Sequence, residues 1–176
     1  MPKLGHIGML QWSGGGGGDG VSILGRGAPN QATTGTAEEV LATISIPANV
    51  VLDGGTIRVL FVGHTAANAN LKTFRIRVGG LTGTVALSSG AVAMNNQTVG
   101  TIVFFITRKS ASTATTHGPF AAAPEGVAQV ATVGIQNMQR SIAVDWTVSN
   151  LLVITATTPT AAGDATLDTY IVELIQ

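Results

Sequence analysis

Histidines and carboxylates are the side chains of this sequence that could bind a metal ion or move protons. The three histidines are His6, His64 and His117. A metal centre on a sheet scaffold needs several histidines and a carboxylate held together on facing strands. No two of these histidines have the His-x-His spacing, and the chain has no cysteine. The sequence therefore predicts no metal site and no cofactor.

Hydrolytic chemistry would require a nucleophile with a base placed beside it. Serine and threonine are frequent, but no Gly-x-Ser-x-Gly elbow occurs. Asp145 is the carboxylate in the least comfortable position, beside Trp146 in an expected strand. It is either a buried acid paired with Arg140 or Arg77 or, as is commoner, an outward-facing strand residue. The other carboxylates weighed as candidates are Glu38, Glu39, Asp168 and Glu173. We predict that the protein is not an enzyme.

Arg58, Arg75 and Arg77 could instead serve recognition. Arg75 and Arg77 share one face of an expected strand, and Arg58 lies on the preceding strand, so the three could form one row across strands. That row would be a docking face for a partner that carries carboxylates. The alternative is a solvated face whose arginines pair with Glu38, Glu39 or Asp53, and surface pairs of this kind contribute little.

Composition restricts the possible partners. The chain has 176 residues, with nine Lys and Arg against nine Asp and Glu. This balance argues against nucleic acid, which needs a basic excess, and against an anionic membrane surface. No apolar run approaches the length of about 18 residues that a membrane span requires. Only 10% of the residues are charged, and the mean hydropathy is +0.39, so we expect much of the surface to be covered in an oligomer or a larger assembly.

The elements that would carry these side chains are strands. Apolar and polar residues alternate with a period of two between glycine, proline and asparagine signals, and no window of helical length has a 3.6-residue period. We predict an all-β, eight- to nine-stranded antiparallel jelly-roll sandwich of two four-stranded sheets, with the C-terminal strand inside one sheet. Residues 62–71 and 110–124 are expected to be long loops. The expected strands cover residues 40–46, 56–63, 73–78, 81–87, 98–108, 126–136, 141–148, 151–157 and 166–175.

The first 35 residues have a different composition. A glycine run at 14–18 joins two short apolar pieces, residues 7–12 and 21–24. No Lys-Ser/Thr pair and no βαβ unit follows the run, so it indicates a flexible linker and not a phosphate-binding loop. We predict an extended arm over residues 1–35 and a sandwich domain over 36–176. The apolar residues of the arm must be buried against the sandwich domain or a neighbouring subunit, and they are the expected partner-binding anchors. They are Leu10, Trp12, Val21, Ile23 and Leu24.

Several stretches of the chain resemble a jelly-roll domain common in tailed-bacteriophage virion proteins, including head decoration (cement) proteins and tail-fibre heads. These stretches are GTAEEVLATISIPA at 35–48, GTIRV at 55–59, NANLKTFRIRVGG at 68–80 and ATLDTYIVEL at 165–174. The resemblance implies a homotrimer on the surface of a virion, made in the host cytoplasm and bound to the major capsid protein. The arm would then tie capsid subunits together.

Two alternatives remain open at this stage. A tail-fibre, receptor-binding or glycan-binding head domain would use the expected loops at residues 62–71 and 110–124. A cupin-like enzyme would hold a metal ion.

Overall fold

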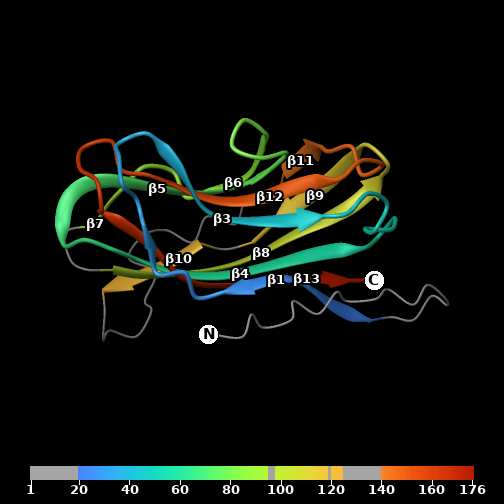
Figure 1. The fold of residues 1–176 in the computed structure, drawn as a ribbon, viewed down its shortest axis with the longest axis horizontal. Helices are drawn as coiled ribbons and strands as arrows, with labels where there is room; N and C mark the ends of the chain where they lie inside the picture. Colours follow the sequence, from blue (N-terminus) through green and yellow to red (C-terminus); the bar gives the residue numbers. More distant parts are fainter. Residues whose placement is uncertain (1–19, 95–97, 119, 125–139) are drawn as a thin grey trace, which may run out of the picture.

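The computed structural model describes residues 20–94, 98–118, 120–124 and 140–176, and in these residues every regular element is a β-strand. Two antiparallel sheets lie face to face, which confirms the predicted all-β sandwich (Figure 1). No helix in the described ranges is long and apolar enough to cross a membrane.

The larger sheet contains eight strands. Its main path runs in the order β1, β13, β4, β8, β9 and β11, while β2 pairs with β13 and β10 pairs with β8. The C-terminal strand β13 lies inside this sheet, between β1 and β4, as predicted. The bounds are β1 (Val21–Gly27), β2 (Gln31–Ala32), β4 (Thr56–Thr65), β8 (Thr98–Ser110), β9 (Thr113–His117), β10 (Phe120–Pro124), β11 (Arg140–Ala143) and β13 (Ala165–Ile175).

The smaller sheet contains five strands in the order β3, β12, β5 and β6, with β7 paired to β5. The bounds are β3 (Glu38–Ile46), β5 (Asn68–Val78), β6 (Thr84–Ser88), β7 (Val92–Met94) and β12 (Asn150–Thr157). The chain changes sheet between β2 and β3, between β3 and β4, between β4 and β5, between β7 and β8, and on both sides of β12.

The core lies between the sheets because alternate residues of each strand point inward. Strand β4 shows this most plainly, since every second side chain from Ile57 onward is buried. Trp146, Phe61 and Phe104 are the largest fully buried apolar side chains of the core. Burial of such aliphatic and aromatic surface is the main stabilising term of a sandwich.

The described residues contain thirteen strands, and not eight or nine in two four-stranded sheets. Both predicted long loops are wrong. Residues 62–71 belong almost entirely to β4 and β5, and residues 110–124 contain β9 and β10. Their threonines and small side chains gave weak alternation, yet each of these strands gains its hydrogen bonds from an antiparallel neighbour. The expected strand at 126–136 lies outside the described residues.

The second half of the predicted arm lies on the sandwich. Strand β1 pairs with β13 over Val21 to Gly27, and β2 pairs with the opposite end of β13. Gly25 permits the close approach of β1 to the smaller sheet, because a Cβ there would lie 2.9 Å from Cγ1 of Ile44. The first half of the arm lies outside the described residues.

Candidate docking surfaces

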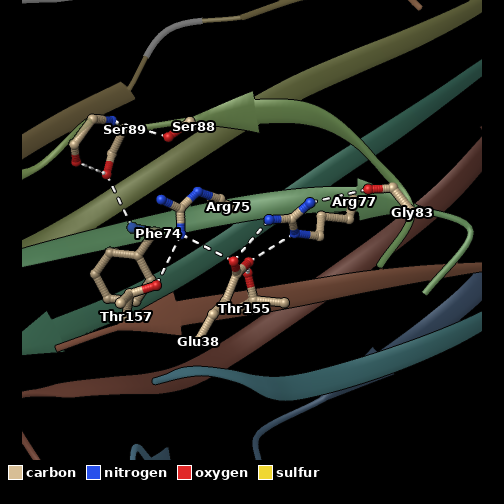
Figure 2. Close-up of polar contacts among 10 residues, drawn as sticks. Glu38, Phe74, Arg75, Arg77, Gly83, Ser88, Ser89, Thr155 and Thr157 are labelled. Carbon is tan, nitrogen blue, oxygen red and sulfur yellow. Dashed lines mark hydrogen bonds and ion pairs between the residues drawn. The ribbon is translucent and has the colours of Figure 1, made fainter. Parts of the chain in front are cut away.

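A cluster of polar side chains occupies the outer face of the smaller sheet, centred on Glu38 (Figure 2). Glu38 opens β3, while Arg75 and Arg77 lie two residues apart on β5. Strand β12 separates β3 from β5 and contributes Thr155, which is the register partner of Arg75. All these side chains point to the same side because residues two apart on a strand share a face.

Arg77 makes the strongest contacts of this Glu38 cluster. Its Nε and Nη2 donate to the two carboxylate oxygens of Glu38 at 2.8 and 2.7 Å, and Thr155 Oγ1 donates to Glu38 Oε1 at 2.6 Å. Its Nη1 donates to the carbonyl of Gly83 at 3.0 Å. Glycine is required at position 83, because a Cβ would lie 2.2 Å from the carbonyl oxygen of Val78. The loop after β5 thereby completes the arginine's hydrogen bonds.

The electrostatics of the Glu38 cluster favour the charged forms. The hydrogen bonds from Arg77 lower the pKa of Glu38 below its ordinary value of 4.5, with further help from Thr155 and the charge of Arg75, although burial opposes them. Glu38 in turn raises the pKa of Arg77. Glu38 and Arg77 are each less than a fifth exposed, so water screens this pair only in part.

The outer face of the larger sheet has a different chemistry. Leu60 on β4, Val103 on β8 and Ile171 on β13 are register neighbours and line a depression of about 340 Å³. Arg58 and Glu173 complete its lining, and the Nη2 of Arg58 lies 2.5 Å from the Oε2 of Glu173. We call these five residues the large-sheet face.

This face breaks the pattern of a solvated sheet. In an antiparallel sheet with one face in water, outward residues are usually polar, whereas strands covered on both faces are apolar throughout. Val62 on β4 and Phe105 on β8 add to the outward apolar residues, and the ring of Phe105 stacks on His117 at 5.0 Å. Ile171 is 36% exposed. The large-sheet face therefore has the composition of a surface that becomes covered.

The predicted arm anchors divide into three groups. Leu24 packs against the core of its own domain. Val21 and Ile23 are 59% and 51% exposed on β1, the edge strand of the larger sheet. Leu10 and Trp12 lie outside the described residues.

The three arginines do not form the predicted row. Arg58 lies on β4 in the larger sheet, whereas Arg75 and Arg77 lie on β5 in the smaller sheet, so the two groups face opposite sides of the sandwich. The error came from assuming that strands adjacent in sequence pair with each other. Arg58 pairs with Glu173, and Arg75 and Arg77 share Glu38. The predicted partner Asp53 contacts Arg108 instead.

The other titratable candidates are dispersed. His64 on β4 contacts Asp168 on β13 at 2.7 Å, His117 stacks on Phe105 far along the same sheet, and His6 lies outside the described residues. Asp145 is not inside a strand. It follows β11 in a turn, fully exposed, where the amide and hydroxyl of Thr147 donate to its carboxylate and lower its pKa. The described residues contain no group of three potential metal ligands.

One buried polar network was missed by the sequence analysis. The side chain of Lys72 on β5 is buried, and its Nζ donates to the carbonyls of Ala66 and Asn68. Asp164 accepts from the amides of Asn68 and Asn70 at 2.9 and 2.7 Å. Desolvation lowers the pKa of Lys72, and the negative charge of Asp164 opposes that shift. The run NANLK, which puts a lysine just after a turn-forming Asn-Ala-Asn, was the available signal.

Solved structures of viral origin are similar to this chain. No protein-family model matches the chain, and no curated protein matches its sequence. Among solved structures, the coat protein of Tobacco streak virus is similar, with 11% identity, a TM-score of 0.24, and 86% of this chain and 85% of that chain covered. A structure of the infectious bursal disease virus Gx strain is similar with 13% identity, a TM-score of 0.26, and 99% of this chain and 46% of that chain covered.

Proposed function

We propose that the protein is a virion structural protein that decorates a capsid as a homotrimer and stabilises the head by binding the major capsid protein. The observation that carries this proposal is the large-sheet face. It presents half-buried aliphatic side chains on the outside of a chain with only 10% charged residues. A surface of that kind is stable in water chiefly when another protein surface covers it. A place on the outside of the virion, after synthesis in the host cytoplasm, fits such a role.

The mechanism would be adhesion by several weak contacts at once. Among the described residues, β1 is an edge strand with no neighbouring strand on one side, and Val21 and Ile23 are exposed on it. This arrangement suits addition of a strand from a capsid subunit. The preceding residues, with Leu10 and Trp12, would bind the same partner. Three copies acting together multiply contacts that are individually modest.

A structural role also agrees with the state of the carboxylates. Glu38 and Glu173 are held by arginines, and Asp145 is held by Thr147. Such contacts occupy the carboxylate oxygens, whereas a general acid or base must be free to reach a substrate. The glycan-binding alternative would use residues 62–71 and 110–124, which the structure describes largely as strands.

The test is a rebinding assay with capsid particles that lack the protein. The chain without residues 1–19 is the informative variant, because it removes Leu10 and Trp12 and keeps β1 on the sheet. We expect full-length protein to bind, and the shortened protein to remain a folded trimer that binds much more weakly. Absence of binding by the full-length protein would refute the decoration role. Full binding by the shortened protein would refute the role of the arm.

A further inference from the structure

Two guanidinium groups share one carboxylate on the outer face of the smaller sheet. Both oxygens of Glu38 accept from Arg77, and the Nη1 of Arg75 reaches Glu38 Oε2 at a longer distance of 3.2 Å. The Glu38 cluster therefore carries two positive charges and one negative charge. Among the described residues, no second carboxylate pairs with Arg75.

We propose that Arg75 is a binding site for a single carboxylate, supplied by an acidic side chain of the protein on which this chain docks. The inference rests on the proposed function, because it assumes a protein partner. It assigns to Arg75 alone the binding of a partner's carboxylate, which the sequence suggested for Arg58, Arg75 and Arg77 together.

The geometry of Arg75 supports this assignment. Its contacts with Glu38 and with the hydroxyl of Thr157, at 2.8 Å, both use Nη1. In the described part of the chain, Nε and Nη2 donate to nothing, and Figure 2 shows these two nitrogens turned away from Glu38. The Nε and Nη2 edge of a guanidinium is the fork that binds a carboxylate through two parallel hydrogen bonds.

Thr157 and Glu38 also fix the position of that fork. An arginine held at Nη1 by two partners has lost much of its rotamer freedom already, so an arriving carboxylate orders less of it. The Arg75 side chain is 25% exposed, which leaves it accessible while reducing the screening by water.

The charge of the site selects a carboxylate over a phosphate backbone. One uncompensated positive charge matches one carboxylate. A nucleic acid requires several cations in a row, and this chain has no excess of them. Arg77 has no comparable free fork, because Glu38 and Gly83 occupy all three of its nitrogens. Arg58 has a carboxylate to itself in Glu173.

Acetate is a suitable probe, because it carries the carboxylate alone. Sodium acetate is titrated into the full-length protein at constant ionic strength against sodium chloride, and the Nε–H resonances of the arginines are followed by NMR. We expect a saturable shift at Arg75 that exceeds those at Arg58 and Arg77. Substitution Glu38→Gln should increase the apparent affinity for acetate, since it removes the competing negative charge. Equal shifts at all three arginines, or none at Arg75, would overturn the proposal.

Rebinding to capsid particles tests the same site against the real partner. We expect Arg75→Gln to weaken binding about tenfold, as the loss of a charge-assisted contact does. Arg75→Lys should recover only part of the affinity, because a lysine keeps the charge and loses the fork. Arg140→Gln, at an exposed position on β11 outside both docking surfaces, is the matched control. If wild-type protein binds and Arg75→Gln binds equally well, this inference fails alone; if wild-type protein does not bind, the proposed function fails.

Discussion

The outer faces of the two sheets differ in the chemistry of their side chains. Both sheets bury aliphatic side chains against each other on their inner faces. On its outer face, the smaller sheet joins Glu38, Arg75 and Arg77 with two threonines into one hydrogen-bonded cluster. The larger sheet instead combines one ion pair with the apolar side chains of Leu60, Val103 and Ile171.

The contrast shows which face is complete within the single chain. The charged groups of the Glu38 cluster satisfy most of one another's hydrogen bonds, so that face is stable in water with one positive charge left over. The side chains of Leu60, Val103 and Ile171 on the large-sheet face have no polar groups that could bond to water. Burial against another surface would stabilise these side chains. Under the proposed function, the smaller sheet would contribute stability and the Arg75 site, whereas the larger sheet would contribute the surface that binds another protein.

The largest expected effect is on stability when the shared carboxylate is removed. Glu38→Ala leaves two partly buried arginines without an anion and should lower the free energy of unfolding by about 2 kcal/mol. Glu173→Ala on the larger sheet is the matched control. Its partner Arg58 is 41% exposed, so we expect a loss of about 0.5 kcal/mol. Urea denaturation measures both, and equal losses would remove the distinction between the two faces.

The second effect is on association. Replacing Leu60 and Val103 together by serine should weaken self-association about tenfold, or about 1.4 kcal/mol, because the face loses apolar area. Light scattering coupled to size-exclusion chromatography measures the molar mass across a dilution series. Leu151→Ser, at an exposed position on the smaller sheet, should leave association unchanged. An unchanged oligomer in the double variant would place the subunit contact elsewhere.

A third effect concerns pH. The pKa of Glu38 is lowered in the folded state, so its contribution to stability is fully present above its ordinary value of 4.5 and is lost as the pH falls through the lowered value. The urea midpoint of the wild type should therefore fall in acid more steeply than that of Glu38→Gln. The pKa values of Asp164 and Glu39 are also lowered, so the urea midpoint of Glu38→Gln should still fall in acid, with a smaller slope than that of the wild type. Identical slopes for the two proteins would show that Glu38 is not held ionised by its arginines.

Within the Glu38 cluster, the smallest effect is expected for Thr155→Val. It removes one hydrogen bond to Glu38 Oε1 and preserves the shape of the side chain, which should cost about 1 kcal/mol. In the acetate titration, the Arg75 shift should persist, because the polar partners that hold Arg75 are Glu38 and Thr157. Loss of that shift would show that the threonine positions the whole Glu38 cluster.

Prediction from the sequence succeeded where local alternation was strong. Strands such as β4, β12 and β13 were expected near their observed positions, because each alternates apolar with other residues and ends at a turn signal. It failed for β9, β10 and the ends of β4 and β5, where threonine, alanine and asparagine blur the pattern. For the three arginines, the sequence named Glu38 among the possible partners, and Arg75 and Arg77 do contact it.

By itself, the sequence determined that this is a two-sheet β protein with few charges, because hydrophobic period and composition act locally along the chain. Only the tertiary structure decided which strands become neighbours. That placed β12 between β3 and β5 and brought Thr155 to Glu38, 117 residues away. It also separated Arg58 from Arg75, since strand pairing depends on long-range hydrogen bonds and burial that no short window of sequence contains.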